Sequence, residues 1–92
     1  MNIRVRIYGD IANTLGTKHQ LQLPRGATVK HLTNHLAAKT GQTRQGHLGE
    51  FKVGGPDLAI MINGRNIQLL DGPDTQLHDQ DDVVIMPFVV GG

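Results

Sequence analysis

The chain has 92 residues, of which 38% are hydrophobic, and a formal net charge of +1 at pH 7. This length predicts a single domain with one modest core. The sequence contains no cysteine and no long apolar run, which excludes disulfides, thiolate metal sites and a transmembrane helix. Residues 1–52 hold eight basic and two acidic residues, whereas residues 53–92 hold one basic and six acidic residues. The acidic half favours docking on a basic partner surface or, alternatively, ordinary solvated turns.

Alternating apolar and polar residues predict two strands at the start of the chain. Residues 3–7 alternate isoleucine and valine with basic side chains, and residues 19–23 alternate again. One helical turn is expected between them at residues 11–15, so the two strands should pair antiparallel. The first segment is typical of a strand and not of a signal peptide, and we therefore expect a cytoplasmic protein.

A helix is predicted to begin after Thr28, a favourable N-cap, and to end at about Thr40, before a glycine. Its apolar residues (Val29, Leu32 and Leu36) fall on one face, which should pack against a sheet. Two histidines, His31 and His35, lie on the opposite face with a spacing that can bind a metal. No third ligand is near in the sequence and this face should point to solvent, so we expect solvated histidines and no metal site.

The second half of the chain is predicted to be a loop followed by strands. Residues 42–57 contain four glycines and a proline, which indicates a long, mobile loop with at most one short turn around Leu48 and Phe51. Strands are expected at residues 58–62 and 67–70, on either side of the Asn63-Gly64 turn, and at residues 83–87. Strands around a single helix indicate an α+β domain with a mixed sheet of four to five strands packed on one main helix. The first and last strands should pair in parallel at its centre.

The sequence ends in Gly91-Gly92, directly after an apolar strand. We expect residues 1–87 to form the domain and residues 88–92 a flexible tail, thin enough at the glycines to enter a narrow tunnel in a partner. An ionised carboxylate at Gly92 becomes an acyl donor only after an ATP-using enzyme activates it. The residues alone leave open a frayed terminus without a function. A similar internal segment, residues 53–55, is interpreted as a loop only.

Other chemistry is poorly supported by the sequence. There is no phosphate-binding loop, and serine is absent, so the chain offers neither a nucleotide site nor a serine nucleophile. Asp79, Asp81 and Asp82 lack the glycine and the terminal glutamate of a calcium loop and are predicted to form a solvated turn.

The last third of the chain resembles the molybdopterin synthase small subunit family. This family belongs to the ubiquitin-like sulfur carriers with a β-grasp fold, as do thiamine sulfur carriers and archaeal small modifier proteins. The resemblance rests on residues 60–67, on residues 74–75, 77–79 and 81–83, which follow in the family's order, and on residues 87–92. The last segment is similar to the family's ending F-P-P-V-A/S-G-G. Phe88 stands where the family has its second proline, and Val90 where it has a small residue, which bears on the partner tunnel that accepts this tail.

The resemblance implies a carrier protein and not an enzyme, with no cofactor of its own. It implies that a ubiquitin-activating-type enzyme adenylates Gly92, that sulfur transfer makes a thiocarboxylate, and that the large subunit of molybdopterin synthase receives the tail. The alternatives are archaeal-type conjugation to lysines of target proteins through Gly92, a different sulfur pathway such as thiamine synthesis or tRNA thiolation, and a binding module with an inert tail. No nucleic acid and no membrane are expected as partners.

A docking surface is expected on the sheet face that the helix does not cover. The strands at residues 58–62 and 83–87 carry apolar residues on both faces, and one helix covers only one of them. Arg65 and the acidic turns should rim the exposed set. The alternative is that the loop at residues 42–57 folds over this face and buries it. The residues expected to bind partners are Met61, Arg65, Met86, Phe88, Val89, Val90 and Gly91.

Overall fold

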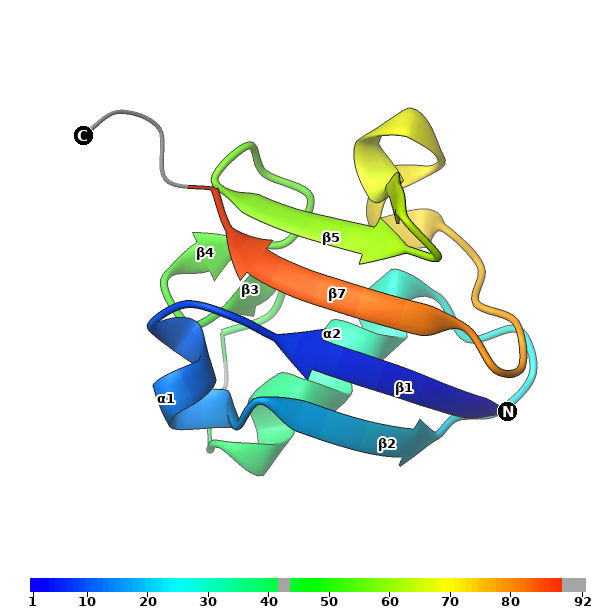
Figure 1. Cartoon of the computed structure of the whole chain (residues 1–92), viewed down its shortest axis with the longest axis horizontal. Helices are drawn as coiled ribbons and strands as arrows, with labels where there is room; N and C mark the ends of the chain where they lie inside the picture. Colours follow the sequence, from blue (N-terminus) through cyan, green and yellow to red (C-terminus); the bar gives the residue numbers. More distant parts are fainter. Residues whose placement is uncertain (42–43, 89–92) are drawn as a thin grey trace.

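The computed structural model describes residues 1–41 and 44–88 and shows a sheet with one main helix across it (Figure 1). The sheet has five strands in the order β2-β1-β7-β5-β6, with β1 and β7 parallel at its centre and the other pairs antiparallel. The prediction of an α+β fold with a mixed sheet and a central parallel pair is confirmed. The elements are β1 (Asn2–Ile7), α1 (Ile11–Leu15), β2 (Lys18–Gln22), α2 (Val29–Lys39), β3 (His47–Leu48), β4 (Phe51–Lys52), β5 (Leu58–Ile62), β6 (Arg65–Asn66), the 3-10 helices η1 (Ile67–Leu69) and η2 (Gly72–Asp74), and β7 (Asp82–Pro87).

The core lies between the sheet and α2. Because side chains alternate along a strand, the isoleucines and valines of β1 and β7 that face α2 are buried, while the intervening residues face the other side. The helix contributes Val29, Leu32 and Leu36, the three residues predicted to form its apolar face, and all three are buried. The two layers thus share one contiguous core.

The predicted start of α2 is confirmed and involves one of the two helix histidines. The backbone N–H of Thr28 donates to Nδ1 of His31 (2.9 Å), which satisfies a backbone group at the helix entrance. This nitrogen is therefore an acceptor in a capping bond and is not free to ligate a metal. His35, one turn further along the same exposed face, has no such contact in the described part of the chain.

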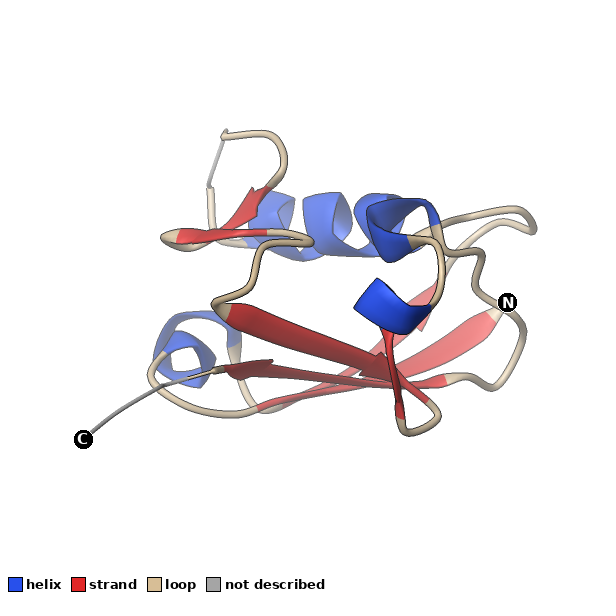
Figure 2. Cartoon of the chain, turned by 90° about the horizontal axis from the view of Figure 1, so that it is seen from above, coloured by secondary structure: helices blue, strands red, loops and turns tan. Residues whose placement is uncertain are grey.

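The segment predicted as a mobile loop is in part a folded hairpin. β3 and β4 pair antiparallel through His47↔Lys52 and Leu48↔Phe51, and the Leu48 side chain is 0% exposed. In Figure 2 this hairpin lies in the same layer as α2, above the sheet. The loop therefore does not cover the opposite sheet face. The prediction missed the hairpin because glycine content indicates turns but says nothing about a leucine that can enter the core.

The strand predicted at residues 67–70 is wrong. β6 ends at Asn66, and residues 67–69 form η1 because the Asn66 side chain accepts a hydrogen bond from the backbone N–H of Gln68 (2.9 Å). This local bond turns the chain away from the sheet. As a result Ile67 is buried, whereas Leu69 is 83% exposed, although a strand would have placed both on one face.

Candidate functional site

The last residue before the predicted tail is held at the end of the central strand. β7 ends at Pro87, and the backbone N–H of Phe88 donates to the carbonyl oxygen of Asp57 (2.7 Å). Gly9 backs Pro87 from the neighbouring turn: a Cβ at position 9 would lie 2.8 Å from Cδ of Pro87, and Gly9 has φ +81. These contacts fix where the chain leaves the domain. The position of Gly9 beside Pro87 depends on the parallel β1–β7 pair, which brings the two ends of the chain together.

The sheet face away from α2 carries an apolar patch beside this exit. Cross-strand register places Met61 opposite Val84 and Ala59 opposite Met86 on this face. Figure 2 shows α2 and the β3–β4 hairpin above the sheet, and no helix from residues 1–41 or 44–88 covers the opposite face. Met61, Val84 and Met86 are partly exposed, and Phe88 is 60% exposed at the tail end. We call Met61, Val84, Met86 and Phe88 the outer patch; Ala59 lies on the same face but is buried.

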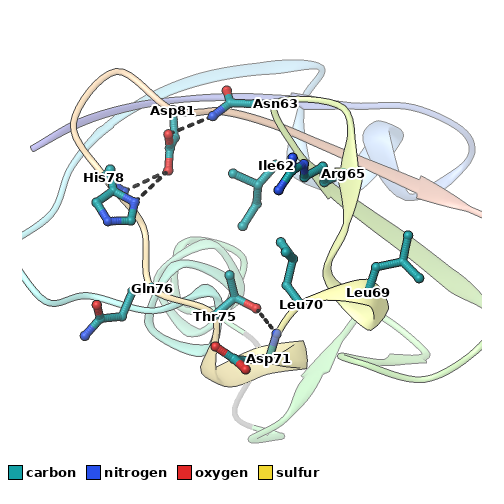
Figure 3. A pocket seen from close by; sticks show the side chains of 10 residues that line it. All are labelled: Ile62, Asn63, Arg65, Leu69, Leu70, Asp71, Thr75, Gln76, His78 and Asp81. Atoms are coloured by element: carbon teal, nitrogen blue, oxygen red, sulfur yellow. Dashed lines mark hydrogen bonds and ion pairs between the residues drawn. The ribbon is translucent and has the colours of Figure 1, made fainter.

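Arg65 is not placed with the outer patch. It pairs with Ile62, whose side chain is on the helix side of the sheet, at the end of β5 far from the tail. There it lines a groove of ≈ 730 Å³ together with Leu69 and Leu70 (Figure 3). The structure therefore brings Met61, Met86 and Phe88 to one face and separates Arg65 from them.

The acidic residues at this far end serve the fold. Asp81 is buried and accepts from the Asn63 side chain (2.9 Å) and from the backbone N–H of His78 (2.8 Å), as Figure 3 shows. Asp82 forms an ion pair with Arg4 (3.0 Å). The backbone N–H of Asn2 donates to Asp79 (2.7 Å) and lowers the pKa of that carboxyl. Three of the six acidic side chains in residues 53–92 thus form hydrogen bonds or an ion pair within the domain.

Residues 1–41 and 44–88 hold no group of three or more histidine, cysteine or acidic side chains arranged to bind a metal. None of the helices in these ranges has the length and hydrophobicity needed to cross a membrane.

Four of the expected functional residues lie outside the described residues: Val89, Val90, Gly91 and Gly92. The internal segment with the same Val-Gly-Gly sequence, residues 53–55, is part of the fold. Val53 is buried, and its backbone N–H donates to the carbonyl oxygen of Gly46 (2.8 Å).

Comparison with known proteins gives a family and a consistent set of relatives. A model of the ThiS family matches residues 5–92. A predicted sulfur carrier protein of Archaeoglobus fulgidus is 34% identical over 65 residues, which cover 71% of this chain and 74% of that protein.

Two solved structures illustrate the structural similarity. Small archaeal modifier protein 1 from Methanosarcina acetivorans has a TM-score of 0.74 at 28% identity, with 99% of this chain and 96% of that chain covered. A predicted molybdopterin converting factor subunit 1 from Pyrococcus furiosus has a TM-score of 0.73 at 25% identity, with 97% and 99% covered.

Proposed function

Because the chain belongs to the ThiS family of ubiquitin-like sulfur carriers, we propose that Gly92 is the residue that carries the sulfur. The observation that supports this most directly is the position of β7. This central strand delivers the chain past Phe88, whose N–H makes a backbone bond to Asp57, into a sequence that ends Val-Val-Gly-Gly. The tail therefore follows directly from the central strand of the sheet, next to an apolar surface that a partner can contact.

The reaction at Gly92 proceeds in two steps. A carboxylate oxygen of Gly92 attacks the α-phosphorus of ATP, and pyrophosphate leaves, which gives an acyl adenylate. A sulfur nucleophile at the oxidation level of hydrosulfide then attacks the acyl carbon, and AMP leaves with the oxygen that had attacked phosphorus. The product is a thiocarboxylate, and no atom is oxidised or reduced. A ubiquitin-activating-type enzyme supplies the site for adenylation, and we place the reaction in the cytoplasm, where ATP is available.

The acceptor of the sulfur is proposed from the relatives. The similarity to a molybdopterin converting factor subunit favours the large subunit of molybdopterin synthase as the protein that receives the tail, and a molybdopterin precursor as the acceptor. Thiamine synthesis and tRNA thiolation remain alternative pathways for the same thiocarboxylate. In each case the chain is a carrier and the substrate of another enzyme.

A second candidate function is protein modification. It is favoured by the 28% identity to a small archaeal modifier protein over nearly the whole of both chains. In this reaction a lysine amine of a target protein attacks the acyl carbon of the Gly92 adenylate, AMP leaves, the nitrogen loses a proton, and an amide forms. The first step is common to both functions, since either requires adenylation.

The proposal is tested by ATP–pyrophosphate exchange with the activating enzyme of the same organism. Addition of one alanine after Gly92 moves the carboxylate by about 3.5 Å and places a side chain in the tunnel, so exchange should be lost. Leu69→Ala is the control, because it changes an exposed side chain far from the tail, and it should retain exchange. Both variants should unfold at the wild-type temperature. Undiminished exchange with the extended chain would show that Gly92 is not the reacting residue.

A further inference from the structure

Two cations face each other across the β1–β2 pair on the same sheet face as the outer patch. Arg6 and Lys18 are directly opposite in the antiparallel register, so their side chains lie on one side of the sheet. Both are exposed, and neither forms an ion pair or a side-chain hydrogen bond with residues 1–41 or 44–88. Like charges in this position destabilise a sheet, and nothing in the fold requires them.

The acid that lines the same depression as Arg6 and Lys18 is already paired. Asp82, on the neighbouring strand, forms its ion pair with Arg4: Nε of Arg4 lies 3.0 Å from Oδ1 of Asp82. A second contact joins Arg4 to the other carboxylate oxygen of Asp82 (3.4 Å). The Arg4–Asp82 pair is thus neutral as a unit and leaves the charges of Arg6 and Lys18 uncompensated beside it.

The two cations line a depression and continue into the outer patch. A pocket of ≈ 310 Å³ is lined by Arg6 and Lys18 together with Arg4, Gln20 and Asp82. In the cross-strand register Lys18, Arg6, Val84 and Met61 follow one another on four adjacent strands. With strands about 4.8 Å apart, this row spans roughly 14 Å between the backbones of β2 and β5. A partner surface that is wider than this row and covers the apolar end therefore also reaches the cationic end.

We propose that the Arg6–Lys18 pair binds one or more carboxylates of the partner protein that docks on the outer patch. The inference rests on the proposed function, because it takes the activating enzyme to be that partner. This face is complemented by a partner surface with an apolar centre and an acidic rim. The distance between that centre and that rim should be roughly the length of the row. A nucleic acid does not fit as well, since its phosphates would have to lie over methionine and valine, with only two uncompensated cations to bind them.

The charge pair next to the outer patch is positive, whereas the distribution of charge along the sequence favoured an acidic docking region. The acidic second half favoured a basic partner, yet Asp79, Asp81 and Asp82 are held by hydrogen bonds or an ion pair within the domain. On the β1–β2 side of the outer patch the exposed, unpaired charges are positive, whereas the exposed Asp57 lies beside Phe88 at the tail end. The partner should therefore present acids to the β1–β2 side of this face.

Kinetics of ATP–pyrophosphate exchange with the activating enzyme of the same organism test this surface. The double variant Arg6→Glu/Lys18→Glu should raise KM for the carrier roughly tenfold and change kcat by less than about twofold. The wild-type KM should rise with NaCl concentration, and this dependence should weaken in the double variant. Arg25→Glu/Lys39→Glu makes the same change in net charge at exposed positions outside this face, and it should behave as the wild type does.

Folding and docking are separated by the single variant Arg6→Glu. It places opposite charges across β1 and β2, so its urea midpoint should equal or exceed that of the wild type, while KM still rises. Equal KM values for the two double variants would overturn the inference and leave the proposed function intact. Absence of exchange with the wild-type chain would instead remove the proposed function and this partner together. Binding of a mixed-sequence RNA oligonucleotide at physiological salt that requires Arg6 and Lys18, with KM unchanged, would also overturn it.

Discussion

Gly9 is the residue that most directly determines where the tail leaves the fold. It has φ +81, and any Cβ at this position would contact the rigid ring of Pro87 at 2.8 Å. Since proline cannot swing its ring out of the way as a long side chain would, an added methyl group must displace the backbone at the end of β7.

Gly9→Ala should therefore destabilise the domain by about 2–4 kcal/mol, from backbone strain together with overpacking. Gly64→Ala is the matched control: Gly64 has φ +85 but no atom within 4 Å of the added Cβ, so only the strain of about 1–2 kcal/mol should remain. Urea unfolding measures both, and amide chemical shifts of residues 85–88 should move in the first variant only. Equal stabilities would show that Pro87 yields freely and does not fix the exit.

Asp79 should make stability depend on pH in a defined direction. The Asn2 N–H donates to its carboxylate and lowers the pKa of Asp79 in the folded state. A lowered folded-state pKa contributes stability above the unfolded-state pKa of about 3.9, and this contribution is lost as the pH falls through the folded-state value. Asp79→Asn should accordingly lower the urea midpoint at pH 7 and have a diminishing effect toward acid pH. Asp71→Asn, at a side chain without such a bond, serves as the control; identical pH profiles for both variants would contradict the assignment.

At the scale of elements, the hairpin β3–β4 decides how much of the segment after α2 belongs to the fold. Leu48 is fully buried in the same core as the sheet, whereas Leu69 in η1 is 83% exposed. Leu48→Ala should cost about 2–5 kcal/mol of unfolding free energy, and Leu69→Ala less than about 0.5 kcal/mol. Chemical denaturation of the two variants compares the same leucine-to-alanine change at a buried and at an exposed position. A loss below about 1 kcal/mol for Leu48→Ala would restore the interpretation of residues 44–57 as a loose loop.

The outer patch is the element-scale feature on which docking depends. Phe88→Asp and Met86→Asp introduce a charge into it, and each should raise KM for the carrier in ATP–pyrophosphate exchange by about tenfold, with a small effect on stability for Phe88→Asp. Leu69→Asp is the control, because it places the same charge on an exposed leucine at the other end of the molecule. If the patch variants unfold the domain and leave no separate binding defect, these residues belong to the core and the partner binds elsewhere.

Elements with strict patterns were predictable from the sequence, and elements set by single contacts were not. The alternation in β1 and the three-residue apolar face of α2 correspond directly to their buried side chains. The hairpin at residues 47–52 depends on one buried leucine, and η1 depends on one asparagine side chain that bonds a backbone group. Such local bonds compete with strand pairing without changing the hydrophobic pattern, so periodicity misses them.

At the scale of the whole molecule, the two halves of the sequence do not form two separate surfaces. β1 from the basic half lies against β7 from the acidic half, so Arg4 meets Asp82 and the charges partly cancel within the sheet. The chain's charge asymmetry predicted an acidic docking region, whereas the sheet topology leaves a cationic pair beside the outer patch. The strand register that places these charges depends on pairing between residues far apart in the sequence, so it cannot be predicted from composition.

The parallel pairing of β1 and β7 also gives the molecule two distinct ends. One end holds Gly9, Pro87 and Phe88, where the tail begins. The other holds the groove of Arg65, Leu69 and Leu70, which lies beyond the opposite end of β5. A partner that receives the tail and covers the outer patch therefore leaves the groove accessible.

Mass measurement of the intact protein and of its fragments tests most directly whether Gly92 carries sulfur as a thiocarboxylate. The protein is incubated with ATP, the activating enzyme of the same organism and a sulfide donor. We expect a mass increase equal to the difference between sulfur and oxygen, located in the fragment that contains Gly92. The chain extended by one alanine should not show this increase. Larger, lysine-linked species would identify the modifier reaction at the same residue. A mass shift located in any other fragment, or an adenylated chain that never gains sulfur or a conjugate, would contradict the account.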